Sequence, residues 1–271
     1  MPDLEIRQYD VTGALGRHLV LDARSLAYRR AYTGDPLHPV EWAPKIPVLD
    51  QQHLTAQGIY TSAFAGSDDV DALGSCTGNA ATALISVLHT ADTLAACGLD
   101  VTDPAAAERW AIGLYADATH RDQWHDYTWP TNDCGSSGLG VAKALRGRGL
   151  IDQYGTATTA EQLAMLLQSG PVLMGLPWHA AFSSPGEDGL ITADPNWQAS
   201  PLEGGHEVCL TALEKTVFNP DGTLADSSVL RFVNSWSASW GDAGSGRLTV
   251  GDYRTLRPEV DLIAPRLDSS R

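Results

Sequence analysis

The pattern of apolar residues in this chain changes its period near residue 170, and this change limits the folds open to it. Before residue 170 the apolar positions recur at helical spacing, and beyond it short runs of strand composition follow one another. The predicted helices begin at Thr77 and Pro104 and cover about 138–147 and 159–168. The predicted strands cover 172–176, 208–213, 229–233 and 247–250. Helices that precede strands in this way predict an α+β protein of two lobes.

Local signals support individual elements of this prediction. Pro104 is a favoured first residue of a helix, and Thr158-x-x-Glu161 has the pattern of a capping box ahead of the last predicted helix. The residues Asn219–Gly222 form a strong turn signal between two of the predicted strands.

The charge of the chain argues against two classes of partner. It has 18 Lys and Arg residues against 33 Asp and Glu residues, for a net charge of −15. Nucleic acids and anionic membranes both attract clustered basic residues, so we expect neither as a partner.

The first residues, Met1–Arg7, lack the basic and apolar regions of a secretory signal, and no window reaches the roughly eighteen apolar residues that a membrane span needs. We therefore expect a cytoplasmic location.

Four cysteines, at positions 76, 97, 134 and 209, are too few and too widely spaced to predict a disulfide framework in a chain of 271 residues. No two of them are two to four residues apart, so the spacing typical of a zinc site is absent. We expect no metal and no organic cofactor.

Cys76 has the sequence surroundings of a reactive thiol. It lies in Leu73–Ala80, where glycines flank it and a predicted helix begins. A helix N-terminus stabilises a thiolate, which is the nucleophilic form of cysteine. A small buried hydrophobic residue that happens to begin a helix is the alternative interpretation.

A histidine and an asparagine provide the other groups that such a nucleophile needs. His206 follows a double glycine at the start of a predicted strand, and Asn234 begins Asn234–Gly241, which contains two tryptophans. An asparagine carbonyl oxygen accepts a hydrogen bond from one ring nitrogen of a histidine and so fixes its tautomer, while a nearby indole excludes water.

Taken together, the three segments resemble the papain family of cysteine peptidases. The order is a Gly-Ser-Cys-Thr-Gly-Asn-Ala segment, then Gly-His before a strand, then Asn-Ser-Trp with a later Trp-Gly. The likeness is greatest to bacterial and phage-encoded members. It implies a two-lobed papain-like fold, with a helical lobe, a β-rich, barrel-like lobe and the active site between them. The expected divisions are an N-terminal extension over 1–46, a catalytic domain over 47–264 and a C-terminal tail over 265–271. Within the catalytic domain, the helical lobe is expected at about 70–150 and the β-rich lobe at about 151–264.

The resemblance also implies site residues beyond the triad of Cys76, His206 and Asn234. The segment Asp133–Gly138 is similar to the one whose main chain pairs with a substrate peptide. Trp178 matches a position in an apolar side-chain pocket, with a plain core tryptophan as the alternative, and Trp236 matches the indole that shields the histidine. The expected substrate-binding residues are Gly135, Ser136, Ser137, Trp178, Gly205 and Trp236.

Two departures from the family pattern concern the surroundings of the thiol. The oxyanion glutamine of the family lies six residues before the cysteine, where this chain has Val70, so we expect Gln51 to take its place, with Gln57 as the alternative. Leu73 replaces the cysteine that pairs with the counterpart of Cys134, so that disulfide is not expected. The roughly fifty residues ahead of Gln51 do not resemble the long inhibitory pro-region of secreted relatives, so no zymogen activation is expected.

The resemblance therefore implies a peptidase that cleaves peptide bonds through a thioester acyl-enzyme, with a peptide or protein as substrate. Two alternatives stay open, a papain-like acyl transferase or transpeptidase and an inactive papain-like binding module. For a phage-encoded protein, the virion or the host cell is a further possible location. The identity of the substrate and the oligomeric state do not follow from the sequence.

Overall fold

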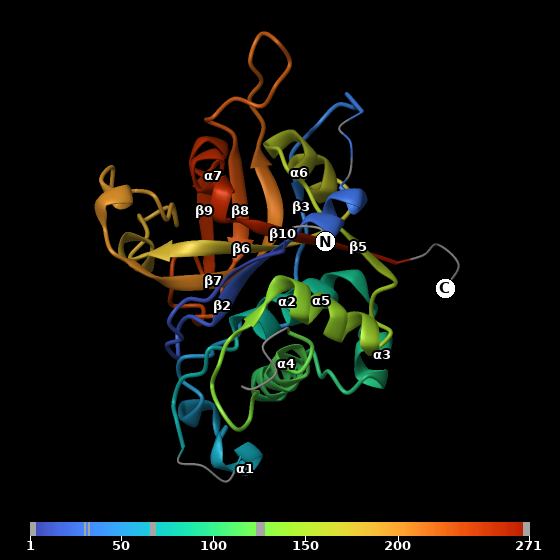
Figure 1. Cartoon of the computed structure of the whole chain (residues 1–271), viewed down its shortest axis with the longest axis vertical. Coiled ribbons are helices and arrows are strands. Elements are labelled where there is room, and N and C mark those ends of the chain that lie inside the picture. Colours follow the sequence, from blue (N-terminus) through green and yellow to red (C-terminus); the bar gives the residue numbers. More distant parts are fainter. Residues whose placement is uncertain (1–3, 30, 32, 66–68, 123–127, 268–271) are drawn as a thin grey trace.

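The chain folds into a strand-rich part and a helical part that lie against each other. A computed structural model describes residues 4–29, 31, 33–65, 69–122 and 128–267. In Figure 1 the strands β6 to β9 lie in the upper half, the helices α2, α4 and α5 lie in the lower half, and strand β2 runs between them. From residue 76 onward, most helices precede most strands, as the apolar pattern predicts, whereas the three described strands before residue 47 were not predicted.

The four helices that the sequence predicts are all present, with one difference in capping, and the described residues include three further helices, at 62–65, 91–96 and 250–256, that were not predicted. The helices are α1 Ser62–Ala65, α2 Cys76–Leu88, α3 Ala91–Ala96, α4 Pro104–Thr119, α5 Gly138–Gly147, α6 Ala160–Leu167 and α7 Val250–Leu256. Helix α6 begins one residue later than the capping-box pattern predicts, because the hydroxyl of Thr159, not that of Thr158, accepts from the Gln162 N–H. Glu161 does not cap the helix as the pattern predicts and forms an ion pair with Arg254 instead.

Among the described residues, the strands include the four runs that the sequence indicates, with changed bounds for three of them, and six further strands that were not predicted. They are β1 Leu4–Arg7, β2 Arg17–Asp22, β3 Val40–Glu41, β4 Ser136–Ser137, β5 Gln153–Gly155, β6 Val172–His179, β7 Leu202–Lys215, β8 Val229–Val233, β9 Ser245–Thr249 and β10 Asp261–Arg266. Within the described residues, one sheet has the order β5-β10-β6-β7-β8-β9 with β3 beside β7, and a second has the order β1-β2-β4. Because β5 and β9 do not pair, the larger sheet is open, and the expectation of a barrel-like lobe is corrected to an open sheet.

The larger sheet separates two hydrophobic cores. Alternate side chains of a strand point to opposite faces, so Met174 and Leu210 join one core while Leu173 and Cys209 join the other. The first core contains α6 and α7, and the second contains α2, α4 and α5. Cys209 is thus a buried packing residue on the face opposite to Leu210.

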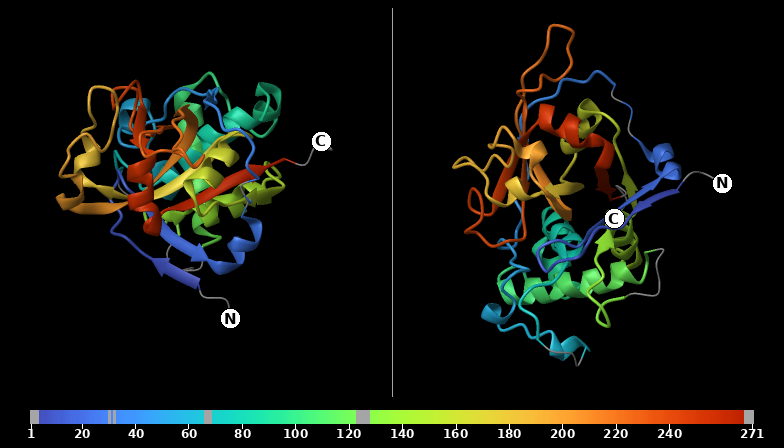
Figure 2. Two further views of the ribbon diagram at one scale, coloured as in Figure 1. Left: turned by 90° about the horizontal axis from the view of Figure 1, so that it is seen from above. Right: turned by 60° about the vertical axis from the view of Figure 1, so that its left-hand side comes forward.

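The residues before position 47 are part of both sheets. Strand β1 pairs with β2, β2 pairs in parallel with β4, and β3 pairs with β7. The right-hand view of Figure 2 shows the N-terminal strands passing between the strand-rich part and the helices. The division of the chain at residue 46 stays a prediction.

Among the described residues, no helix combines the length and the apolar character that crossing a membrane requires.

A hydrogen-bonded clamp joins helix α4 to the loop ahead of α2. Tyr115, on α4, donates its hydroxyl proton to Asp133 Oδ1 at 2.7 Å and accepts from the Gly135 N–H at 2.8 Å. The other carboxylate oxygen of Asp133 accepts from the Gly74 N–H at 2.8 Å. None of the four cysteines forms a disulfide, and this clamp connects two segments that a disulfide joins in the family that the sequence resembles.

We predict that Tyr115→Phe lowers the free energy of unfolding by about 1–3 kcal/mol, because it removes the hydroxyl that donates to Asp133 Oδ1 and accepts from the Gly135 N–H. Chemical denaturation of the two proteins measures the difference. Tyr28→Phe, which removes a hydroxyl from an exposed ring, is the matched control and should change stability little. Equal effects of the two substitutions would show that the clamp contributes nothing.

Candidate active site

Cys76 is the first residue of helix α2, and its side chain is fully buried. Ser75 is the N-cap, but its hydroxyl bonds Asn79 Oδ1 rather than a main-chain N–H of the first turn. Helix α2 packs on strand β7, so Cys76 faces the part of β7 that carries His206 and Glu207. The sulfur therefore lies where the helical and strand-rich parts meet.

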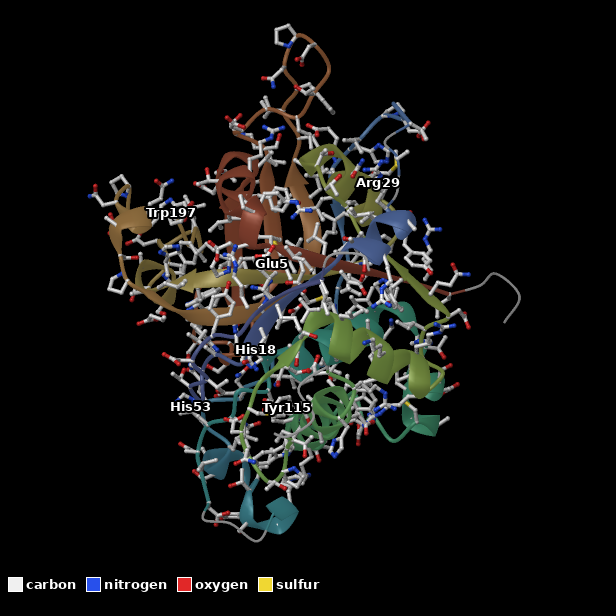
Figure 3. All side chains as sticks on the ribbon, in the orientation of Figure 1. Glu5, His18, Arg29, His53, Tyr115 and Trp197 are labelled. Carbon is white, nitrogen blue, oxygen red and sulfur yellow. The ribbon has the colours of Figure 1, made fainter. Side chains whose placement is uncertain are left out.

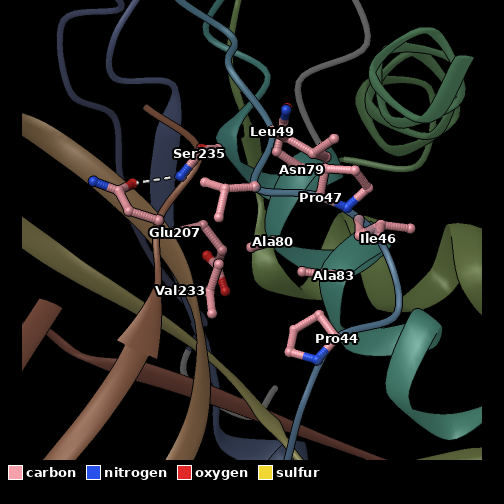
Figure 4. Close-up of a pocket in the computed structure, with 12 residues that line it drawn as sticks. Pro44, Ile46, Pro47, Leu49, Asn79, Ala80, Ala83, Glu207, Val233 and Ser235 are labelled. Carbon is pink, nitrogen blue, oxygen red and sulfur yellow. Dashed lines mark hydrogen bonds between the residues drawn. The ribbon is translucent and has the colours of Figure 1, made fainter. Parts of the chain in front are cut away.

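His206 and Asn234 are hydrogen-bonded to each other. The distance from His206 Nε2 to Asn234 Oδ1 is 2.7 Å, and an amide oxygen can only accept, so Nε2 carries the proton. In the neutral ring, Nδ1 then keeps its lone pair, and no described residue hydrogen-bonds to it. Asn234 Oδ1 also accepts from the Ser235 N–H at 2.8 Å, as drawn in Figure 4. The imidazole is thus oriented with a basic nitrogen available.

Two tryptophans hold the imidazole of His206. The ring centroid of Trp178 lies 4.7 Å from that of the imidazole, in an edge-to-face arrangement, and the ring centroid of Trp236 lies 4.8 Å from it. Trp178 is fully buried and its indole N–H donates to the Ser183 hydroxyl. In this structure Trp178 packs behind the histidine and does not face an open pocket.

Residues 9–18, which we call the covering segment, lie over this site. The main-chain oxygen of Gly16 accepts from the Ser136 N–H at 2.7 Å, and the oxygen of Ala14 accepts from the Trp236 indole at 3.1 Å. Figure 3 shows His18 of this segment at the boundary between the two parts of the molecule. A cavity of about 520 Å³ remains beside the segment, lined by Ala14, Trp236 and Trp240 among others. Nothing in the sequence indicates this cover.

The covering segment approaches the main chain so closely that side chains would not fit. A Cβ atom added at Gly16 would lie 1.8 Å from the main-chain oxygen of Gly74, and one added at Gly205 would lie 2.1 Å from that of Arg17. The Gly135–Ser137 segment and Gly205 thus contact the covering segment with their main chain, in the manner expected for a substrate peptide.

Gln51 lies beside the covering segment, whereas Gln57 does not. The Gln51 amide nitrogen is 2.7 Å from the Leu73 oxygen and 3.5 Å from the oxygens of Gly13 and Ala14. Gln57 instead donates to the oxygens of Asp50 and His53. Of the two candidates, only Gln51 is brought to the site.

A buried carboxyl group, which sequence reasoning missed, fixes the segment that carries Gln51. Glu108 of helix α4 accepts from the Asp50 N–H at 2.8 Å and from the Asn79 amide at 2.5 Å. It is fully buried, and burial raises its pKa to about 7. The sequence shows only an acidic residue in a helix that also contains Arg109 and Asp117, which does not distinguish Glu108 from a surface position.

Burial keeps both Cys76 and His206 neutral in this arrangement. It raises the pKa of the Cys76 thiol to about 12, although the main-chain groups of Glu207 and Gly16 act in the opposite direction. Burial also lowers the pKa of His206 to about 4, against the favourable hydrogen bond to Asn234. Both groups are therefore uncharged in the covered site, and they do not form an ion pair.

Comparison with known proteins identifies the fold. No protein-family model matches the chain, and no curated protein matches it. Xylellain, a cysteine protease from Xylella fastidiosa, has a TM-score of 0.59 at 16% identity, over 94% of this chain and 97% of xylellain. A chain from a study of the mite allergens Blo t 1 and Der p 1 has a TM-score of 0.49 at 14% identity, over 88% of this chain and 74% of that one. The likeness to xylellain confirms the two-lobed, papain-like α+β fold.

We predict that Cys76 is the slow cysteine of the intact chain. Iodoacetamide at pH 8 should modify the partly exposed Cys97 first and leave Cys76 as unreactive as the buried Cys209, because reagent and solvent do not reach either sulfur. Mass spectrometry of the digested protein measures the order. Rapid labelling of Cys76 below pH 7 would mean that the site is open in solution.

We predict a loss of stability with rising pH that comes from Glu108. Its pKa is about 7 in the folded chain against an ordinary 4.5, so its contribution is complete below pH 4.5 and decreases as the pH rises to about 7. The Glu108→Gln variant should be less stable overall but should lack this part of the pH dependence. Glu187→Gln, at an exposed position, should keep the slope of the parent chain. Identical slopes for parent and Glu108→Gln would contradict the assignment.

Proposed function

We propose that this protein is a cysteine peptidase in which Cys76, His206 and Asn234 form the catalytic triad. The observation that carries the proposal is the His206–Asn234 hydrogen bond, which leaves Nδ1 as a base, at the meeting of β7 with the N-terminus of the Cys76 helix. The papain-like fold supports it, because that fold is shared with a cysteine protease over nearly the whole chain. The substrate would be a peptide or a protein.

The proposed reaction follows from these groups. His206 Nδ1 takes the proton of the Cys76 thiol, and the sulfur attacks the peptide carbonyl carbon. The Gln51 amide and the Cys76 N–H stabilise the oxyanion. His206 then gives its proton to the leaving amine as the C–N bond breaks. Water adds to the thioester as His206 accepts one of its protons. His206 returns this proton to the sulfur as the C–S bond breaks, which releases the carboxylic acid and restores the Cys76 thiol.

Catalysis requires the covering segment to move, because it occupies the place of the substrate. When it leaves, Cys76 and His206 lose the burial that keeps both neutral. The helix N-terminus and the imidazolium then favour the thiolate. The resting chain is proposed to be inactive and its uncovered form active. This differs from the sequence expectation of no zymogen activation.

The inactive-module alternative has one observation in its favour, which is the neutral, buried state of Cys76 and His206. Acyl transfer uses the same residues as hydrolysis, so only its products distinguish it. An added amine that appears in the product would identify a transferase.

Leu15→Ala provides the test, because Leu15 anchors the covering segment in the core and its truncation weakens the cover. We predict that this variant hydrolyses a denatured protein substrate faster than the parent chain does. In the same background, Cys76→Ala should abolish hydrolysis, and Gln51→Ala should lower kcat by about 10²–10³ through the loss of one oxyanion donor.

Cys209→Ala in the Leu15→Ala background is the matched control, since Cys209 is equally buried but lies in the core below the sheet. It should keep the activity. Hydrolysis that persists in Cys76→Ala would overturn the proposal. So would a Leu15→Ala protein in which Cys76 reacts with thiol reagents but cleaves no peptide.

A further inference from the structure

Arg17 of the covering segment carries a fully buried positive charge between the two parts of the molecule. Its Nη2 bonds the carboxylate of Asp261 and, at 3.2 Å, the main-chain oxygen of Glu259. A buried guanidinium is stable only where the surrounding groups compensate for its lost hydration. The place that holds Arg17 is therefore built for a positive charge.

The surroundings of Arg17 come from a row of residues across three neighbouring strands. Asp261 on β10 pairs with Gly175 on β6, and Gly175 pairs with Glu207 on β7, so the three positions share one face of the sheet. Gly175, the middle residue of this row, leaves room for the side chain of Arg17, because a Cβ atom added at Gly175 would lie 2.4 Å from Arg17 Nε. We call Gly138, Gly175, Glu207 and Asp261 the acidic pocket.

Helix α5 closes this pocket from the helical side. A Cβ atom added at Gly138, its first residue, would lie 2.7 Å from one carboxylate oxygen of Asp261 and 3.2 Å from one of Glu207. Both carboxyl groups thus converge on a space between the sheet and the helix. Glu207 also lines a cavity of about 160 Å³ together with Ala80 and Val233 (Figure 4).

The pocket has hydrogen-bonding capacity that Arg17 leaves unused. Both carboxyl oxygens of Glu207 are buried and have no hydrogen-bond partner among the described residues, and the same holds for Nε and Nη1 of Arg17. Burial raises the pKa of Glu207 well above its ordinary value. Buried polar groups are nearly always paired, so an unpaired carboxyl group aimed at a guanidinium calls for an explanation.

The acidic pocket adjoins the proposed catalytic groups on both sides. Gly16, the neighbour of Arg17, is the residue whose main chain reaches the sulfur of Cys76. Glu207 directly follows His206 on β7. A side chain in the pocket therefore belongs to a residue next to the one held at the thiol.

We propose that the acidic pocket is a substrate subsite for a basic side chain. In the covered chain, Arg17 occupies the place that the arginine side chain of a substrate would take. The two converging carboxyl groups suit the planar fork of a guanidinium better than an ammonium group, so arginine is preferred over lysine. This inference rests on the proposed peptidase function and names its substrate class, peptides with an arginine beside the residue that carries the reacting carbonyl.

A binding experiment tests the pocket without any catalysis. The full-length Arg17→Ala variant empties the pocket, and its thermal unfolding is followed with agmatine and with butylurea, a neutral molecule of similar shape. We expect agmatine to raise the melting temperature and butylurea to leave it unchanged. The increase should vanish in Arg17→Ala/Asp261→Asn. Equal effects of the two molecules on Arg17→Ala would overturn the subsite.

A labelling experiment tests the preference at the thiol. Peptidyl vinyl sulfones carry either arginine or its neutral isostere citrulline next to the reactive residue. We expect the arginine reagent to label Cys76 of Arg17→Ala about ten- to a hundredfold faster, as the loss of a charge-assisted hydrogen bond predicts. The Leu15→Ala variant, which keeps the acidic pocket intact, provides the same comparison if Arg17→Ala does not fold.

The two experiments separate the two proposals. Labelling of Cys76 without a preference for arginine overturns the subsite and leaves the peptidase function standing. Selective binding of agmatine with no labelling of Cys76 by either reagent supports the pocket and overturns the peptidase.

Discussion

The close contact of main chain with main chain between the two lobes is the constraint on which the covered site depends. Gly16 and Gly205 stand where any side chain would overlap the backbone opposite. This proximity lets Ser136 and Trp236 donate hydrogen bonds to the backbone of the covering segment. Both acceptors in the covering segment are backbone oxygens, so a different chain with its own side chains can take the same path if it has room at the same two points.

Strand β7 connects the reacting groups with the groups that would select a substrate. Its buried stretch places His206 on one face of the sheet and Glu207 on the other, as the alternation of a strand requires. The imidazole meets Trp178 and Trp236 on its own face. Glu207 meets Asp261 and Arg17 on the other. A shift of β7 against β6 by one residue would exchange the two faces and destroy both arrangements at once.

The sequence was most informative where a short segment carries its own chemistry. The motifs around Cys76, His206 and Asn234 predict neighbours in space, and His206 and Asn234 are hydrogen-bonded. Helix α5 begins and ends where the apolar pattern predicts. The change of period near residue 170 predicts the order of helices and strands, although not the open edges of the sheet.

What the sequence did not reveal depends on contacts between distant segments. The covering segment has no motif of its own, and its position follows from hydrogen bonds to residues more than a hundred positions away. The choice between Gln51 and Gln57 depends on Glu108, which fixes the backbone at Asp50 from another helix. The acidic pocket is formed only when β10 pairs with β6, so Asp261 and Glu207 are unremarkable in the sequence.

The clamp of Tyr115, Asp133 and Gly74 bears on how the chain reaches its folded state. A disulfide in that place would need an oxidant and a correct pairing partner before the loop ahead of α2 was fixed. Hydrogen bonds form as the segments meet and need no second reagent. Without a disulfide, the chain can organise the loop ahead of α2 in a unimolecular process whose outcome does not depend on the redox potential of its surroundings.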